Sequence, residues 1–433
     1  MKKRRIDIIS LGCSKNLVDS ERLMRRLSEC GFVVCHNSDD VKGDIVVVNT
    51  CGFIGDAKEE SINTILSCAE AKNEGRVEQL YVMGCLSERY RDELAKEIPE
   101  IDRIYGKYDW EAMVADLAKA NPQIPPYERT ITTPPHYSYV KISEGCNRFC
   151  AFCAIPLITG KLKSRDMDEI LSEVRYLTGK GVKEFNIIAQ DLSAYGLDRY
   201  RRLALPELVD KMAKIEGAEW IRLHYAYPAQ FPFDLLDVMA EHPNVCKYLD
   251  IALQHIDNRV LSNMRRHITK EETLALIDTI RRKVPNIHLR TTLMVGFPGE
   301  DEKAFDELKR FVAEARFERM GAFAYCEEDG TYAAKHYADD IPQEVKDRRL
   351  AEIMELQEAI SLETNRSKIG TTLKVIVDRE EPDYFVGRTE FDSPEVDPEV
   401  LIKKNEQLRI GEFCQAKITD ALPFELMAEA ANA

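Results

Sequence analysis

The chain has 433 residues, 44% of them hydrophobic, and a net charge of −15 with an isoelectric point near 5.2. This charge argues against non-specific attraction to nucleic acids or anionic membranes, but leaves room for a local basic patch or a basic protein partner. The first residues, MKKRRIDIISLGC, contain an apolar run that is too short for a signal peptide. The sequence contains no run of about 18 apolar residues, so no membrane-spanning helix is predicted. We therefore expect a cytoplasmic protein in which the 12 cysteines do not form disulfides and any clustered subset of them serves metal or redox chemistry.

The first 120 residues alternate strand-like and helix-like segments. Apolar, β-rich runs at 6–12, 44–52 and 79–85 are each followed by a helical pattern. This alternation predicts a parallel sheet covered by helices, in which ligands bind beyond the carboxyl ends of the strands. Residues 121–136 are rich in Pro and Thr and are predicted to form a linker.

Residues 137–366 repeat the strand–helix alternation about six times, which predicts a partial or full β/α barrel. The expected strands are 137–143, 184–189, 220–225, 248–252, 287–295 and 320–325. Residues 367–433 change to short strands separated by turn residues, which predicts a small all-β barrel. The predicted fold class is therefore α/β with a C-terminal all-β domain.

Cys146, Cys150 and Cys153 lie within eight positions, in the stretch ISEGCNRFCAFCAIP, with no histidine nearby. A structural zinc site needs four ligands, so zinc binding would require a distant fourth residue. Thiolates also hold iron–sulfur clusters, and three ligands leave one iron of a 4Fe–4S cluster open to a small molecule. The spacing, with Phe152 before the last cysteine, resembles the radical S-adenosylmethionine (SAM) superfamily. That resemblance implies that SAM binds the open iron, with Phe152 near its adenine.

Cys13, Cys51 and Cys85 each follow one of the three N-terminal strands. The carboxyl ends of parallel strands share one edge, so we expect these cysteines to meet there, although buried core thiols are the alternative. The segments SLGCSKNLVDSE, NTCGFIGDAKEES and VMGC resemble the N-terminal domain of the methylthiotransferases. The resemblance implies that these three cysteines hold a second, auxiliary 4Fe–4S cluster, which carries the sulfur to be inserted.

Further segments resemble family blocks along the central region: NIIAQDLSAYG, LQHIDNRVLSNMRR and RTTLMVGFPGE. They imply cofactor contacts from Gln190, Asp191, Val295 and Gly296, with an ordinary polar loop after the strand as the alternative for Gln190 and Asp191. Arg290 is a candidate partner for the SAM carboxylate, with a barrel ion pair as the equal alternative. The chain departs from the family at Thr159-Gly160, where an Arg-Gly pair is usual, so that Lys161 or Lys163 would have to supply the basic contact near the cluster.

Methylthiotransferases divide into a branch that modifies a tRNA adenosine beside the anticodon and a branch that modifies the β-carbon of an aspartate in a small-subunit ribosomal protein. The C-terminal region resembles the TRAM domain, an OB-like substrate reader. Its fourteen acidic and eight basic residues give a net charge of −6, which disfavours RNA and favours a basic ribosomal protein, with an acidic solvated surface of no specific role as the alternative. The segment GRTEFDSPEVD (387–397) also resembles the ribosomal-protein branch.

The sequence thus predicts a radical-SAM methylthiotransferase of the ribosomal-protein branch, with two 4Fe–4S clusters and SAM as cofactors. We expect the ribosomal protein, free or on the ribosome, as partner, a flavodoxin- or ferredoxin-like electron donor, no membrane contact and no RNA binding by the TRAM domain. The tRNA branch is the alternative enzyme, and a zinc-binding scaffold without enzymatic activity is the third hypothesis.

Overall fold

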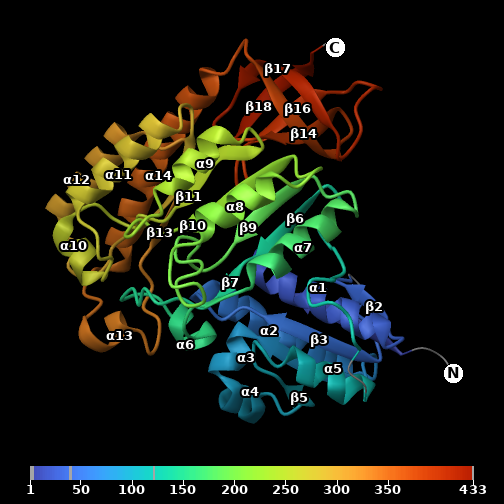
Figure 1. Cartoon of the computed structure of the whole chain (residues 1–433). Coiled ribbons are helices and arrows are strands. Elements are labelled where there is room, and N and C mark those ends of the chain that lie inside the picture. Colours follow the sequence, from blue (N-terminus) through green and yellow to red (C-terminus); the bar gives the residue numbers. More distant parts are fainter. Residues whose placement is uncertain (1–3, 39–40, 120–121, 432–433) are drawn as a thin grey trace.

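The computed structural model describes residues 4–38, 41–119 and 122–431. Residue 121, the first of the predicted linker, lies outside these ranges, as do the first three residues. Along the chain, an N-terminal α/β unit is followed by a larger central α/β unit and then by a β-barrel, drawn in blue, in green to orange and in red in Figure 1. The domain boundaries at 120, 136 and 366 stay predictions.

The N-terminal unit is a five-stranded parallel sheet in the order β2-β1-β3-β4-β5. The three predicted strands are confirmed, and two short strands that the sequence did not reveal extend the sheet at its edges. The strands are β1 (Arg5–Ser10), β2 (Val33–His36), β3 (Ile45–Thr50), β4 (Gln79–Gly84) and β5 (Arg103–Ile104). The helices are α1 (Ser14–Glu29), α2 (Gly55–Asn73), α3 (Cys85–Arg89), α4 (Arg91–Glu97) and α5 (Trp110–Ala118).

Strand β3 is buried on both faces, which explains its uninterrupted run of β-branched residues. Ile45 and Val47 pack into one apolar core, and Val46 and Val48 pack into the other. Since every residue from Ile45 to Thr50 is buried, this strand fixes the centre of the sheet and the position of the cysteine that follows it.

The central unit contains six parallel strands in the order β13-β12-β11-β10-β9-β6, which form an open sheet and not a closed ring. Of the two predicted forms, the partial barrel is therefore the one observed. The strands are β6 (Tyr137–Lys141), β9 (Glu184–Ile188), β10 (Trp220–Ala226), β11 (Val245–Ile251), β12 (His288–Val295) and β13 (Arg319–Ala324), and a two-stranded ribbon is formed by β7 (Ser143–Glu144) and β8 (Lys163–Ser164). The helices are α6 (Ile155–Thr159), α7 (Met167–Thr178), α8 (Leu205–Ala213), α9 (Asp234–Glu241), α10 (Asn258–Asn263), α11 (Lys270–Lys283), α12 (Glu302–Ala315), α13 (Tyr332–His336) and α14 (Gln343–Arg366).

The two faces of this sheet differ in chemistry. Phe185 and Leu223 belong to the large apolar core formed with the surrounding helices. Alternate residues point the other way, and Glu184, Arg222 and His224 are buried and polar. Because side chains alternate along a strand, this pattern gives the partial barrel an apolar outside and a polar interior.

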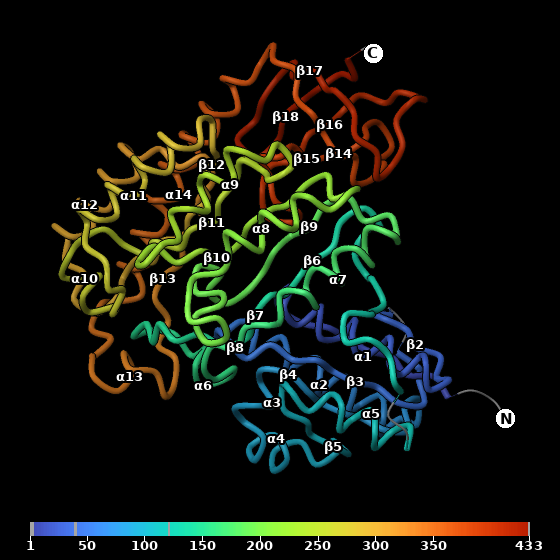
Figure 2. Tube along the Cα trace, in the orientation of Figure 1, coloured from blue at the N-terminus to red at the C-terminus, as the bar shows by residue number. Residues whose placement is uncertain are grey.

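The C-terminal unit is a closed barrel in the order β14-β15-β16-β18-β17, as predicted. Its strands are β14 (Thr372–Glu380), β15 (Tyr384–Thr389), β16 (Glu399–Lys403), β17 (Phe413–Ala421) and β18 (Glu425–Ala430). It packs against the central unit where the strands of that unit begin (Figure 2). At this junction His136 Nε2 lies 2.8 Å from Asp378 Oδ1, and the centres of the Trp220 and Phe413 rings are 4.9 Å apart. None of the described helices is long and apolar enough to cross a membrane.

Candidate functional site

One cavity of about 630 Å³ is lined by residues of all three units. It lies between the carboxyl edge of the N-terminal sheet and the polar interior of the partial barrel. All six cysteines singled out from the sequence line it: Cys13, Cys51, Cys85, Cys146, Cys150 and Cys153. Since these residues are spread over 141 positions of the chain, it is the packing of the two α/β units that brings them together.

The first three cysteines meet because β1, β3 and β4 are neighbours in the sheet and two glycines allow close approach. Gly12 has φ +81°, and a Cβ at this position would lie 2.6 Å from the Cβ of Cys51. A Cβ on Gly52 would lie 2.7 Å from the backbone nitrogen of Leu86, next to Cys85. The glycine beside each cysteine is therefore needed to bring the strand ends together.

The other three cysteines lie on the loop between β7 and α6, where basic residues contact the sulfurs. Arg266 donates from Nη1 to Cys150 Sγ at 3.3 Å, and the backbone N–H of Arg148 faces Cys146 Sγ at 3.5 Å. Lys161 and Lys163, the basic residues expected from the sequence, are exposed. The buried Arg266 was missed, although it ends the block LQHIDNRVLSNMRR that had been singled out.

Burial sets the protonation of most of these thiols. It raises the pKa of Cys146 to about 11 and that of Cys85 to about 12, and it also raises the pKa values of Cys51 and Cys153. Burial acts in the same direction on Cys13, but the charge of Lys15 and the N–H of Asn16 outweigh it and lower the pKa of that thiol. Buried thiols of this kind become thiolates when a cation is bound beside them.

The donor set fits an iron–sulfur cluster better than a single ion. Within the described ranges, no three His, Cys, Asp or Glu side chains converge closely enough to hold one metal ion. A cluster of four irons is larger than one ion and holds its thiolates farther apart, which suits two sets of three cysteines around one cavity. This arrangement argues against the zinc scaffold, since structural zinc sites are closed by four ligands.

The residues predicted to contact SAM fall into two groups. Phe152, Gln190 and Arg290 line the cavity, although Arg290 forms the alternative barrel ion pair, with Nη1 2.5 Å from Asp397 Oδ1. The other three do not line the cavity: Asp191 pairs with Arg148, Val295 is fully buried in the apolar core, and Gly296 packs under Lys346. Their proposed roles as SAM contacts stay predictions.

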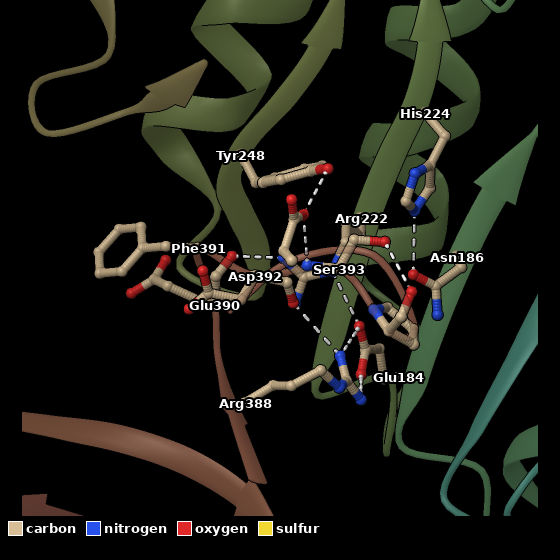
Figure 3. Close-up of polar contacts among 12 residues, drawn as sticks. Glu184, Asn186, Arg222, His224, Tyr248, Arg388, Glu390, Phe391, Asp392 and Ser393 are labelled. Atoms are coloured by element: carbon tan, nitrogen blue, oxygen red, sulfur yellow. Dashed lines mark hydrogen bonds and ion pairs between the residues drawn. The ribbon is translucent and has the colours of Figure 1, made fainter. Parts of the chain in front are cut away.

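A loop of the C-terminal barrel, residues 390–397, forms the floor of the cavity and will be called the floor loop. Figure 3 shows it entering the partial barrel beside Arg222 and Tyr248. Its Asp392 binds Arg319 Nε at 2.9 Å, and its Asp397 accepts the Tyr248 hydroxyl at 2.9 Å. Ser393, Pro394, Glu395 and Val396 line the cavity.

The floor loop is anchored by a buried ion-pair network at the base of β9. Glu184 accepts two hydrogen bonds from Arg388 of β15, at 2.7 and 3.1 Å, and one from Arg222 at 2.9 Å (Figure 3). Burial by itself would raise the pKa of Glu184, but these two guanidinium groups outweigh burial and hold that pKa below its usual value. Buried ion pairs between charged side chains therefore connect the C-terminal barrel to the central unit.

This network also changes the interpretation of the acidic C-terminal region. Asp392 and Asp397 are fully buried, and Asp378 is mostly buried against Arg388 and His136. These three acids therefore neutralise arginines within the molecule and are not available to a basic partner, so the net charge of −6 overstates the acidity of the surface.

Comparison with known families gives three matches along the chain. Residues 140–312 match the Radical SAM superfamily, residues 369–431 match the TRAM domain, and residues 5–106 match the uncharacterized protein family UPF0004.

Relatives match over the full length. The ribosomal protein uS12 methylthiotransferase RimO of Bacteroides thetaiotaomicron is 60% identical, covering 100% of this chain and 99% of that protein. The protein of the same name from Cytophaga hutchinsonii is 49% identical, covering 99% of this chain and 98% of that protein.

Solved structures share the fold at low identity. The radical SAM methyltransferase TsrM from Kitasatospora setae gives a TM-score of 0.57 at 13% identity, over 77% of this chain and 74% of TsrM. The cobalamin-dependent radical enzyme OxsB gives 0.52 at 13% identity, over 83% of this chain and 56% of OxsB.

Proposed function

Because the chain belongs to the RimO family of radical-SAM methylthiotransferases, we propose that it adds a methylthio group to the β-carbon of an aspartate in ribosomal protein uS12. The observation that carries the proposal is the single cavity into which two sets of three cysteines face from different units. A zinc scaffold would not need two such incomplete sets of thiols beside one another.

Cys146, Cys150 and Cys153 are the proposed ligands of the cluster that binds SAM, and Cys13, Cys51 and Cys85 are those of the auxiliary cluster. When bound, the first cluster with SAM would supply a radical able to break the unactivated Cβ–H bond, the auxiliary cluster would supply the sulfur, and a second SAM would supply the methyl group. The protein has to bind the clusters, orient the substrate and exclude water.

Three observations support this division of roles. The guanidinium of Arg266 is buried and donates to Cys150 Sγ at 3.3 Å, so it holds this sulfur in position at the cavity wall. Phe152 lies beside the cysteines and packs edge-on against Phe297, so that its ring is held in position at the cavity wall. Gln190 lines the cavity at the end of β9 and offers an amide for a polar group of SAM.

We further propose that the enzyme works in the cytoplasm and takes electrons from a flavodoxin- or ferredoxin-like protein. The C-terminal barrel is proposed to meet the ribosomal protein and not RNA, on the strength of its remaining surface acids.

The mass of uS12 from a strain that lacks the gene tests the function. We expect the methylthio mass increment on the aspartate to be absent there and to return when the gene is restored. If the increment persists and methylthioadenosine disappears from the tRNA nucleosides instead, the tRNA branch is the correct assignment.

A further inference from the structure

Five lysine and arginine side chains line the cavity, and four of them are engaged by other groups of the protein. Arg148 pairs with Asp191 at 2.6 Å, and Arg290 pairs with Asp397 at 2.5 Å. The other two, Lys107 and Arg266, bind Asp19 at 3.0 Å and the sulfur of Cys150 at 3.3 Å.

Lys15 is the fifth, and its ammonium is not used in an ion pair. It lies in the first turn of α1, two residues after Cys13, and is only 9% exposed. Its Nζ lies 3.4 Å from the centre of the Tyr225 ring. Within the described part of the chain, no carboxylate lies within ion-pair distance of this Nζ, and the ammonium is therefore open to the cavity that the residue lines.

The backbone of Tyr225 is held in an unusual conformation that presents its ring to the cavity. Tyr225 has φ +64° and is the last residue but one of β10, where the pairing with β11 shifts register. Its N–H donates to Asp250 Oδ2 at 3.3 Å, and its side chain stays 38% exposed and lines the cavity. Strain of this kind in a non-glycine residue is kept where the surrounding structure fixes it, often at ligand-binding sites.

We propose that Lys15 binds the side-chain carboxylate of the target aspartate, an inference that rests on the proposed function. The carboxylate would supply the ion-pair partner that no described side chain provides, while the Tyr225 ring lies against the ammonium from the other side. The β-carbon of aspartate is bonded directly to that carboxylate. An aspartate held by Lys15 therefore has its reacting carbon close to Cys13, one of the proposed ligands of the sulfur-carrying cluster.

Lys15 would then also select the class of substrate. An aspartate side chain carries the negative charge that a buried ammonium needs, whereas an adenine base carries none. A charge-assisted hydrogen bond in a buried site contributes about 1.5–3 kcal/mol, which corresponds to a roughly 10- to 150-fold change in affinity.

The test measures the binding of purified uS12 to the reconstituted full-length enzyme, using wild-type uS12 and a variant with the target Asp changed to Asn. We expect the wild-type enzyme to bind the Asp form at least about tenfold more tightly than the Asn form. The Lys15→Met enzyme should bind both forms equally, and Lys15→Arg should keep the preference. Lys180→Met is the matched control, since Lys180 also lies over a tyrosine ring, 5.4 Å from the centre of Tyr176, but on the surface.

The ratio of the two affinities separates this role from others. A general loss of folding or of iron weakens the binding of both forms and leaves the ratio unchanged, so iron content and SAM binding are measured on the same samples. Retention of the Asp preference by Lys15→Met overturns the inference; if SAM affinity falls in that variant while the preference stays, Lys15 serves the carboxylate of SAM instead. Failure of the wild-type enzyme to bind or modify uS12 would overturn the proposed function itself.

Discussion

Glu184→Gln is the most direct test of the junction between the partial barrel and the C-terminal barrel. The carboxylate of Glu184 is fully buried and neutralises two guanidinium groups, those of Arg222 and Arg388, which are 0% and 2% exposed. Glutamine keeps the shape but removes the charge, and its NH₂ group has no acceptor among these donors. In this variant, Arg388 would keep its ion pair with Asp378, but the hydrogen-bond partners of Arg222 would be backbone carbonyl groups alone, without a carboxylate.

The expected cost follows from leaving a buried charge without its partner, which is about 3–5 kcal/mol. A tenfold change in an equilibrium corresponds to about 1.36 kcal/mol. The fraction of molecules with an open junction should therefore rise by a factor of roughly 10² to 10^3.7. Because the pKa of Glu184 is lowered in the folded protein, the stabilisation is complete above the ordinary carboxyl pKa of about 4.3 and is lost as the pH falls below it.

Hydrogen exchange of the floor loop and of β15 measures this opening, since local openings appear as faster exchange of the amides that they expose. We expect exchange in these segments to rise by at least about 100-fold in Glu184→Gln at neutral pH. Glu207→Gln is the matched control, because Glu207 forms an exposed pair with Lys211 at 2.7 Å, and such pairs contribute little. Equal exchange in Glu184→Gln and the control would refute the view that this network holds the junction.

Three further predictions concern the cavity. Burial raises the pKa of Asp250 to about 6, so the free energy of unfolding falls as the pH rises from about 4 to 6. In thermal unfolding, the Asp250→Asn variant should therefore be more stable than the wild type by up to about 3 kcal/mol at pH 8 and by little at pH 4. Equal gains in stability at both pH values would contradict this explanation. Cys146→Ala and Cys13→Ala should each lose about half of the roughly eight irons bound after anaerobic reconstitution, as measured by iron and sulfide analysis, and an unchanged iron content in either variant would remove that residue from the ligand set. Gly145 has φ +68°, and a Cβ at this position would lie 2.1 Å from a backbone carbonyl oxygen. The Gly145→Ala variant should therefore have a lower thermal midpoint and a lower iron content. The control variant Gly179→Ala, at a helix end with φ −63°, should change neither quantity.

The sequence allowed the strands and the cysteine sets to be predicted because both depend on local signals. The β-branched run at Ile45–Thr50 is buried on both faces, and its boundaries differ from the predicted 44–52 by one or two residues. The expectation that Cys13, Cys51 and Cys85 share one edge needed only parallel strands, and the neighbouring strand order confirms the geometry on which it relied. The short edge strands β2 and β5 were missed because two to four residues carry too little pattern.

Contacts between distant parts of the chain could not be predicted in the same way. Arg266 is separated from Cys150 by 116 residues, and Arg290 from Asp397 by 107. Neither pair carries a local signal, since an arginine in a strand or after a helix has many potential partners. The count of charges in the C-terminal region has a related weakness, because it includes acids that are buried against arginines and do not face solvent, although the expectation of a ribosomal-protein partner that it supported stays a prediction.

The floor loop links the choice of substrate to the integrity of the whole molecule. Glu395 has φ +70° and faces the hydroxyl groups of Tyr137 and Tyr139 at 3.2 and 3.4 Å, and it lines the same cavity as Lys15. One cavity is therefore lined both by the proposed cluster ligands and by a loop of the C-terminal barrel. If that barrel contacts the ribosomal protein, as proposed, then the same domain both meets the substrate and completes the chamber. An enzyme with an open junction would consequently lose substrate discrimination along with stability, even with every cysteine intact.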